Sequence, residues 1–323
     1  MEKVALVGAI DASMRKLIEG MLPEGFETDY VPTPAEYGRL KDTDYIIIRT
    51  IPIRAETIET LTKTKLIQRW GVGYDIIDIE AAGKKNIPVA NMAGINALQV
   101  AELAVMHMLV IYRNLIPMHN GLMAGQWLKS EYMNRSFMMS GKTVGLVGFG
   151  NIGKNVAKRV RAFGAEVQYY DVIRPSREKE EELGVKYVPF EDLLKTSDIV
   201  SLHVPVSADT KGLINRKTIE LMKPTAVLIN TSRGPVVNQA DLVEALSKGR
   251  LFGAGLDVYE EEPLKEDHPF RSLKNVVMTP HVGANTVDNN PNMARRAVDN
   301  IVTVSKGLPV PAGDLVNAQY LKK

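Results

Sequence analysis

Residues 142–153 read KTVGLVGFGNIG, a predicted strand that runs into three glycines spaced G-x-G-x-x-G. Gly148 permits a tight turn, Gly150 lets the backbone approach a pyrophosphate without a Cβ in the way, and Gly153 allows a helix to pack closely on the strand. The N-terminus of that helix can then hold the anion. This stretch predicts the strand, turn and helix of a dinucleotide-binding fold.

The next predicted strand, residues 165–171, ends on Asp171. A carboxylate at this point accepts hydrogen bonds from the ribose hydroxyls of NAD and repels the 2′-phosphate of NADP. A lone G-x-G-x-x-G is a weak signal, but together with its strand, its helix and Asp171 it predicts an NAD site. Arg174 and Arg177 follow and could soften the repulsion, although both suit the solvated start of a helix better.

Outward from this motif, short β-branched runs alternate with helical patterns over almost the whole chain. Such alternation is typical of βαβ units and parallel sheets, so the predicted fold class is α/β with two doubly wound parallel-sheet domains. The predicted strands are residues 4–8, 45–49, 65–70, 87–90, 142–148, 165–171, 198–204, 225–230, 252–258 and 275–280.

The length of 323 residues suits two domains, each large enough to bury its own core. Between the two groups of strands, residues 96–115 carry apolar side chains at helical spacing for about five turns, too long for a routine crossover. We expect this helix to bridge the domains. A last helix, opened by Pro291 and ending near Gly307, is too small to form a third domain.

Composition excludes several classes of protein. The net charge is +2 and no Lys/Arg block appears, so nucleic acid is not an expected partner. Cysteine is absent, which excludes disulfides, thiolate nucleophiles and Cys-based metal sites, and no metal is predicted. The N-terminus has no signal-peptide pattern, and the apolar segment 103–112 is too short to span a bilayer. We expect a cytoplasmic protein without a membrane partner.

Ligands of an open parallel sheet collect beyond the carboxyl ends of its strands. Arg233, Asp257 and His281 all follow or end predicted strands there, and the acidic run YEEEPLKED, which contains Glu262, follows Asp257. Reduction of a 2-oxo acid needs a cation for the carboxylate, a proton donor for the carbonyl oxygen, and a carboxylate that keeps the donor protonated.

Arg233, His281 and Glu262 match these three requirements. A guanidinium grips a carboxylate bidentately and stays charged. Imidazole titrates near neutral pH, and a neighbouring carboxylate favours imidazolium, the form that donates a proton in reduction. Spacing alone does not select one glutamate from the acidic run.

The other four histidines have less specific interpretations. His107 lies in the long apolar helix and is expected to be a packed core residue, whereas His119 and His268 are expected in surface loops. His203 ends the strand 198–204 and could line the cofactor pocket or satisfy a buried backbone group, and both alternatives stay open.

The ordered motifs GFGNIG with Asp171, LHVP, NTSRG, GLDVYEEEP and TPHVGA resemble the D-isomer-specific 2-hydroxyacid dehydrogenase family over nearly the whole chain. The resemblance implies reversible hydride transfer between NADH and a 2-oxo acid, with catalytic residues Arg233, Glu262 before Pro263, and His281 after Pro280. The backbone amides of Val72 and Gly73, in a GVG loop, would hold the substrate carboxylate with Arg233. The implied NAD contacts are Gly148, Gly150, Asn151, Ile152, Gly153, Asp171, Val204, Pro205, Thr210, Thr231, Ser232 and Asp257, the last toward the nicotinamide carboxamide.

The resemblance also implies a discontinuous architecture. A flavodoxin-like substrate domain would comprise residues 1–98 and 291–323, and a Rossmann NAD-binding domain, residues 99–290, would be inserted in it. Members of the family are usually homodimers joined through the nucleotide domain. The methionine- and aromatic-bearing stretch from Arg113 to Met139 suits such a contact, or could be a surface arm.

Substrate identity stays open at this point. Phosphoglycerate dehydrogenases of the family carry arginines near the substrate phosphate, and Arg49 and Arg69 are candidates here. Trp70 departs from the small residue usual after the second arginine, and no regulatory domain is expected, so D-3-phosphoglycerate is the second choice beside glyoxylate, hydroxypyruvate and branched or aromatic 2-oxo acids. Formate dehydrogenases usually carry glutamine where Glu262 stands.

Two hypotheses place the protein in a class other than enzymes. A non-catalytic NAD(H)-sensing binding protein is one, since transcriptional corepressors share this fold. A structural subunit with a vestigial site is the other, but it would lack a member of the catalytic trio, and none is missing.

Overall fold

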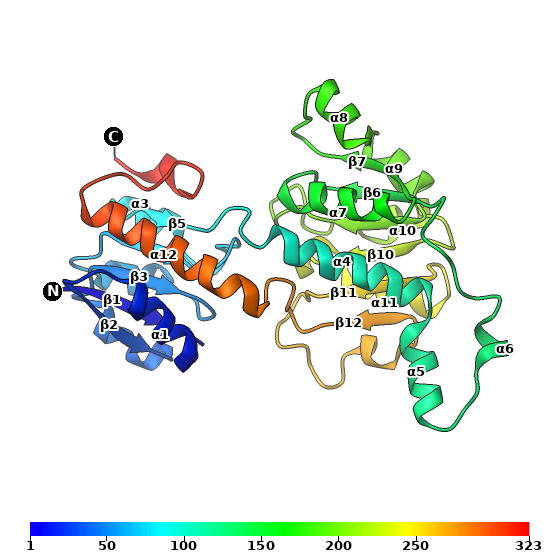
Figure 1. Cartoon of the computed structure of the whole chain (residues 1–323), viewed down its shortest axis with the longest axis horizontal. Helices are drawn as coiled ribbons and strands as arrows, with labels where there is room; N and C mark the ends of the chain where they lie inside the picture. The colour runs from blue at the N-terminus through cyan, green and yellow to red at the C-terminus, as the bar shows by residue number, and fades with distance from the viewer. Residues whose placement is uncertain (323) are drawn as a thin grey trace. The chain divides into compact units, whose positions relative to one another are not determined.

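Residues 1–322 are described by the computed structural model, whose internal contacts divide the chain into two units (Figure 1). Unit 1 comprises Met1–Asn96 and Asn285–Lys323, and unit 2 comprises Ala97–Ala284. The divisions therefore fall after residues 96 and 284, compared with the expected positions after residues 98 and 290.

Unit 1 contains a parallel sheet of five strands in the order β2-β1-β3-β4-β5 within the described residues, the order of a flavodoxin-like sheet. Successive residues of β1 point to opposite faces. Val4 and Leu6 pack with α1 and α12, whereas Ala5 and Val7 pack with α2 and α3. The elements are β1 (Glu2–Val7), α1 (Ala12–Met21), β2 (Phe26–Val31), β3 (Tyr45–Ile48), α2 (Ala55–Thr60), β4 (Leu66–Arg69), α3 (Ile79–Lys84), β5 (Val89–Ala90) and α12 (Asn290–Ser305).

Unit 2 contains a sheet of seven strands in the order β12-β11-β10-β9-β6-β7-β8 in the described part of the chain, and all of its strand pairs are parallel. Counted from β6, this is the doubly wound order of a Rossmann sheet, extended by one strand. The strands are β6 (Thr143–Val147), β7 (Glu166–Tyr170), β8 (Lys186–Tyr187), β9 (Ile199–Leu202), β10 (Val227–Asn230), β11 (Gly253–Leu256) and β12 (Val276–Met278).

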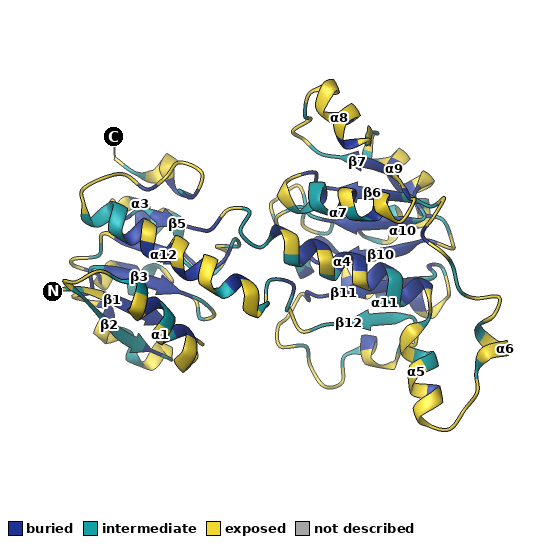
Figure 2. Ribbon diagram, viewed as in Figure 1, coloured by how far each residue is buried: buried dark blue, intermediate teal, exposed yellow. Residues whose placement is uncertain are grey.

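Helices cover both faces of this sheet, so its strands carry most of the buried residues of unit 2 (Figure 2). Val144 and Leu146 of β6 pack in the cluster that contains α4 and α7, and Val147 packs with α9, α10 and α11 on the other face. The helices are α4 (Ala97–Tyr112), α5 (Leu115–Met123), α6 (Lys129–Tyr132), α7 (Asn151–Ala162), α8 (Arg177–Leu183), α9 (Phe190–Thr196), α10 (Arg216–Leu221) and α11 (Gln239–Ser247).

The two parallel sheets confirm the predicted α/β class, and three local features differ from the prediction. Strands β2 and β8 were not predicted, because β2 (FETDYV) is a largely half-exposed edge strand without an apolar run and β8 has two residues. The helix expected over 96–115 is present as α4 (Ala97–Tyr112), but it ends three residues earlier than expected. Asn114 adopts a left-handed conformation, φ +49°, which ends α4 and turns the chain into α5 at 64°.

The helices of residues 1–322 are short compared with a lipid bilayer. None of the individual helices has both the length and the apolar character to cross a bilayer, and only the bent pair of α4 and α5 reaches that length when the two are taken together.

Candidate active site

The glycine turn after β6 has the predicted geometry. Gly148 has φ +96°, and a Cβ there would lie 2.7 Å from the carbonyl of His203. A Cβ on Gly153 would lie 2.4 Å from the carbonyl oxygen of Gly148, whereas one on Gly150 would meet nothing within 4 Å. Gly148 and Gly153 are therefore required by close packing within unit 2, and Gly150 leaves open space before α7.

Asp171 links this turn to the end of β7. Its Oδ2 accepts a hydrogen bond of 2.5 Å from the amide of Phe149, and its Oδ1 accepts one of 2.9 Å from the amide of Ile173. These two amides orient the carboxylate beside the glycine turn, where an acceptor for ribose hydroxyls is needed.

Other predicted cofactor residues follow β9 and β10 on the same carboxyl edge of the sheet. The Thr210 hydroxyl donates to the carbonyl of Pro205 at 2.6 Å, and the Ser232 hydroxyl donates to Asn230 Oδ1 at 2.8 Å. The Thr231 hydroxyl is buried and has no hydrogen-bond partner in the described residues. Val204 is half-buried near the glycine turn.

These observations test whether the residues fit a dinucleotide. A buried hydroxyl without a partner needs one from a ligand or from water. Helix α7 has Gly150 as its N-cap residue and therefore no side-chain cap, so its first amides can bind an anion. Together with the open space at Gly150, these groups fit the phosphates and riboses of NAD.

The side chains of His281 and Glu262 are hydrogen-bonded on the same edge. His281 Nδ1 and Glu262 Oε2 are 2.7 Å apart, and the side chains are 48% and 35% exposed. Glu262 Oε1 also accepts from the amide of Tyr259 at 3.0 Å. Burial alone would raise the pKa of Glu262, but these hydrogen bonds and the charges of His281 and Arg233 hold its pKa below the usual value. The carboxylate is therefore charged near neutral pH.

The other glutamates of the acidic run have different partners. Glu260 Oε1 accepts from the amide of Gln239 at 3.1 Å, and Glu261 pairs with Lys265 at 2.7 Å. Of the three consecutive glutamates, Glu262 is the one that contacts the imidazole of His281.

Asp257 is a buried carboxylate that organises the loop carrying His281. Its Oδ1 accepts from the Thr279 hydroxyl at 2.6 Å and from the Val282 amide at 2.9 Å, and its Oδ2 accepts from the Gly283 amide at 2.9 Å. The His281 amide donates to the backbone carbonyl of Asp257 at 2.8 Å. These bonds hold His281 at φ +53°, a conformation uncommon for a residue other than glycine.

Thr279, which bonds Asp257, also contacts His107, a residue that was expected only to pack in the core. Thr279 Oγ1 lies 3.2 Å from Nε2 of the fully buried His107. Because the Thr279 proton is donated to Asp257, His107 Nε2 must be the donor to Thr279. Burial lowers the pKa of His107 against the opposing charge of Asp257, which keeps the ring neutral. The position of Thr279 two residues before His281 was the signal available in the sequence.

Arg233 is held by its backbone neighbours after β10. Asn230 Nδ2 donates to the Arg233 carbonyl at 3.0 Å, and Arg233 NH1 donates to the Ser232 carbonyl at 2.7 Å. A Cβ on the following Gly234 would lie 1.9 Å from the Tyr259 carbonyl, so this loop packs directly on the segment leading to Glu262.

The remaining histidines are not part of this cluster. His203 Nε2 lies 3.0 Å from Ser201 Oγ, and burial lowers the pKa of His203 to about 3. Its Nδ1 is buried without a hydrogen bond in the described residues, so His203 bonds a side chain and not a backbone group. His268 accepts from the amide of Phe270 at a short turn, and His119 lies exposed on α5 and not in a loop as expected.

The GVG loop lies in unit 1, at the end of β4. The Val72 carbonyl accepts from Asn91 Nδ2 at 2.8 Å, and the Gly73 carbonyl accepts from Arg69 Nε at 2.6 Å. The amides of Val72 and Gly73 donate no hydrogen bond within residues 1–322. Arg69 NH1 also donates to the carbonyl of Trp70 at 2.6 Å, so Arg69 stabilises the conformation of the loop.

Comparison with known proteins gives consistent matches. Residues 105–283 match the NAD-binding domain of D-isomer specific 2-hydroxyacid dehydrogenases. A glyoxylate reductase from Thermococcus litoralis is 42% identical over 289 residues, which cover 88% of this chain and 86% of that protein. A D-3-phosphoglycerate dehydrogenase from Archaeoglobus fulgidus is 39% identical over 266 residues, which cover 82% of this chain and 50% of that protein. The NAD complex of an NAD-dependent formate dehydrogenase from Staphylococcus aureus is 30% identical, with a TM-score of 0.86 and coverage of 98% of this chain and 99% of that one.

These matches confirm the family resemblance and the expected cofactor. The family match falls within unit 2 and contains the glycine turn, Asp171 and the loops with Arg233, Glu262 and His281. The chain belongs to the D-isomer-specific 2-hydroxyacid dehydrogenase family and is an NAD-dependent oxidoreductase that acts on the CH–OH group of 2-hydroxy acids.

Proposed function

We propose that Arg233, Glu262 and His281 are the catalytic residues of a reductase for small 2-oxo acids, with glyoxylate as the preferred substrate. The observation that carries this proposal is the 2.7 Å contact between His281 Nδ1 and Glu262 Oε2. The names of similar proteins, glyoxylate reductases among them, support the substrate. Because reduction needs a supply of NADH, we place the enzyme in the cytoplasm.

Each member of the trio has a separate role. Arg233 binds the substrate carboxylate and polarises the adjacent carbonyl. His281, as imidazolium, gives its Nε2 proton to the carbonyl oxygen, and Glu262 on Nδ1 stabilises the charged ring and orients it. In oxidation, neutral His281 accepts the hydroxyl proton. Bound NADH supplies the hydride, and NAD+ receives it in the reverse direction.

The cofactor and substrate contacts implied by the resemblance are part of the proposal. The amides of Val72 and Gly73 in unit 1 are assigned to the substrate carboxylate, supported by their lack of a hydrogen-bond acceptor within residues 1–322. Unit 1 is then the substrate domain. The residues assigned to NAD are Gly148, Gly150, Asn151, Ile152, Gly153, Asp171, Val204, Pro205, Thr210, Thr231, Ser232 and Asp257.

Arg69 helps to choose between glyoxylate and phosphohydroxypyruvate. Its Nε donates to the carbonyl of Gly73, and its NH1 donates to the carbonyls of Ile48, Arg49 and Trp70. A guanidinium whose Nε and NH1 already bond backbone carbonyls is a weaker candidate for a phosphate ligand, because a phosphate contact through those two groups would compete with these bonds. This favours the smaller substrate.

NADH oxidation with a panel of 2-oxo acids tests the proposal. Glyoxylate should give a higher kcat/KM than phosphohydroxypyruvate, 2-oxoglutarate or 2-oxoisocaproate. Arg233→Ala should lower kcat/KM about a thousandfold through the loss of a bidentate charged contact and of carbonyl polarisation. Arg216→Ala, which removes an exposed ion pair with Glu244, is the matched control. Tight NADH binding without turnover on any acid would favour the NAD(H)-sensing alternative.

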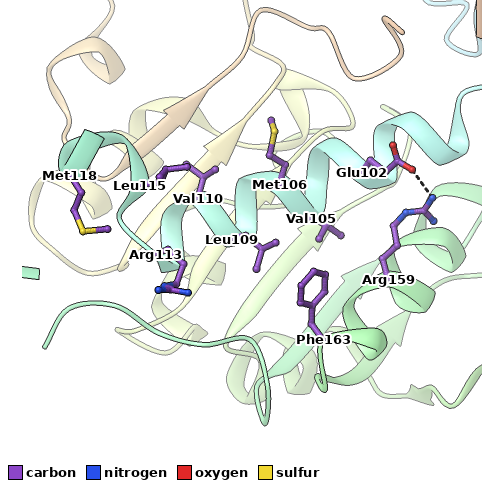
Figure 3. A pocket seen from close by; sticks show the side chains of 10 residues that line it. All are labelled: Glu102, Val105, Met106, Leu109, Val110, Arg113, Leu115, Met118, Arg159 and Phe163. Atoms are coloured by element: carbon purple, nitrogen blue, oxygen red, sulfur yellow. Dashed lines mark hydrogen bonds and ion pairs between the residues drawn. The ribbon is translucent and has the colours of Figure 1, made fainter. Parts of the chain in front are cut away.

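We also propose that the enzyme is a homodimer joined through unit 2. A cavity of about 620 Å³ is lined by side chains of α4, α5 and the end of α7 (Figure 3). Its lining is mostly apolar and includes Met106, Leu109, Leu115 and Phe163, with the ion pair Glu102–Arg159 at one end. Exposed apolar side chains continue from it along the chain at Ile116, Leu122, Met123, Trp127, Met133 and Met138.

An apolar surface of this kind is typical of an interface between copies of a chain. Sedimentation equilibrium should give twice the monomer mass. Met106→Glu should shift the protein toward monomer, whereas Val287→Glu, on an exposed apolar residue of unit 1, should not. A monomer at all concentrations would contradict the proposal.

A further inference from the structure

Two arginines follow Asp171 at the ribose end of the NAD site, and their partners differ. In dinucleotide-binding folds, an arginine near this acidic position is the group that accommodates the 2′-phosphate of NADP. The engagement of Arg174 and Arg177 therefore bears on which coenzyme the chain accepts.

Arg174 is held by a buried carboxylate on α8. Its Nε donates to Glu180 Oε1 at 2.6 Å and its NH2 donates to Glu180 Oε2 at 2.8 Å. Its guanidinium also lies over the ring of Tyr187, 4.7 Å from the centroid. The contact with Glu180 is bidentate, the strongest geometry available to an arginine and a carboxylate.

Glu180 is itself buried and has a second hydrogen-bond partner. Its side chain is 8% exposed, and the Tyr169 hydroxyl donates to its Oε1. Hydrogen bonds from Arg174 and Tyr169 lower the pKa of Glu180 to about 2, so it is charged throughout the physiological range. Removing Arg174 from a buried, charged carboxylate is costly, because the charge is left unpaired.

Arg177 has no comparable restraint. It pairs with Glu181 at 3.1 Å one turn along α8, and the two side chains are 85% and 69% exposed. Exposed pairs of this kind contribute little and exchange readily with water. Consecutive glutamates of the same helix therefore make two comparable contacts, one in which the glutamate is buried and one in which it is exposed.

We propose that Glu180 contributes to coenzyme specificity by engaging the guanidinium of Arg174, so that Arg174 does not offset the charge of Asp171 at the adenosine ribose and NADPH binds more weakly than NADH. Asp171 supplies the repulsion of the 2′-phosphate. Glu180 engages one of the two arginines that could offset it. Arg174 is thus anchored to α8 through Glu180 and is not a coenzyme ligand.

Binding of NADH and NADPH, followed by the change in nicotinamide fluorescence, tests this inference without turnover. The unaltered chain should bind NADH at least about a hundredfold more tightly than NADPH. Glu180→Gln removes the charge that retains Arg174, and should tighten NADPH binding about tenfold while NADH binding changes less than about twofold. Glu181→Gln should leave both affinities unchanged.

The double variant Glu180→Gln/Arg174→Met identifies the source of the gain. If released Arg174 contacts the 2′-phosphate, the double variant should bind NADPH as weakly as the unaltered chain. Retention of the gain in the double variant, or a folded Glu180→Gln variant with unchanged affinities, would overturn the proposal.

The single variant Arg174→Met provides a separate test that does not depend on whether the Glu180 variant folds. Because Arg174 is already engaged, this variant should bind NADPH as weakly as the unaltered chain does. A further tenfold weakening would mean that Arg174 already contacts the phosphate, and would also overturn the proposal.

Discussion

His281 and His107 lie in two adjoining regions of unit 2 whose surroundings are opposite. At the exposed rim, His281 is about half exposed and contacts the Glu262 carboxylate. At the buried base, His107 is fully buried, and its Nε2 contacts the Thr279 hydroxyl. Water and a carboxylate allow an imidazole to gain a proton, whereas burial against a neutral hydroxyl disfavours it. The region of His281 and Glu262, called the rim below, is therefore suited to proton transfer. The region of His107 and Thr279, called the base, is suited to holding the loop of His281 in position.

We expect the largest difference in kcat when each of the two histidines is replaced by glutamine. His281→Gln removes the proton donor of the rim and should lower kcat about a thousandfold, within the range for general acid catalysis. His107→Gln retains an Nε2–H group that can donate to Thr279, and should change kcat less than about threefold. Steady-state kinetics of both variants checks this, and similar losses would abolish the distinction between rim and base.

Glu262→Gln should give the next largest effect. The amide keeps the shape of the side chain but no longer favours imidazolium, so we expect kcat to fall about thirtyfold and reduction to fail at a lower pH than in the unaltered enzyme. The lowered pKa of Glu262 means that the carboxylate stays ionised to below pH 4.5 in the unaltered enzyme. The pH profile of kcat is the measurement. Glu261→Gln is the control, since Glu261 pairs with Lys265, and a profile unchanged in Glu262→Gln would argue against the pair.

Thr279→Val tests how the base supports the rim. The loss of the hydroxyl removes one of three hydrogen bonds to the Asp257 side chain and leaves His107 Nε2 without its acceptor. One lost bond of this kind costs about 1–2 kcal/mol, so kcat should fall about tenfold with little change in KM. Thr279→Ser should restore kcat. If Ser and Val behave alike, the hydroxyl has no positioning role.

The smallest effect is expected on acid stability. Burial lowers the pKa of His107 below 6.5 in the folded state, so below pH 6.5 the unfolded chain binds a proton that the folded chain does not. The contribution is fully present above pH 6.5 and is lost as the pH falls toward the folded-state pKa. His107→Gln should reduce the slope of unfolding free energy against pH in this window by up to about 1.4 kcal/mol per unit. An unchanged slope in denaturant titrations would show that His107 does not titrate between the two states.

Much of the fold could be predicted because its signals are local. The strand, glycine turn and helix of 142–163 follow from close packing that glycine alone permits at Gly148 and Gly153, and the parallel sheets follow from the apolar strands between helices. Edge strand β2 could not be predicted in this way, because an edge strand buries little and needs no apolar run. Neither could the break at Asn114, since its left-handed backbone conformation interrupts an otherwise helical apolar pattern.

The class of fold, the dinucleotide turn and the residue types at the carboxyl ends of the strands all follow from the order of the amino acids. Which of these side chains contact one another depends on the folded chain. Glu262 and not its neighbours reaches His281, Thr279 and His107 lie beneath the loop, and Glu180 engages Arg174. The reason is physical. Periodicity and glycine spacing act over a few residues, whereas hydrogen-bond partners, burial and charge depend on side chains brought together from distant parts of the chain.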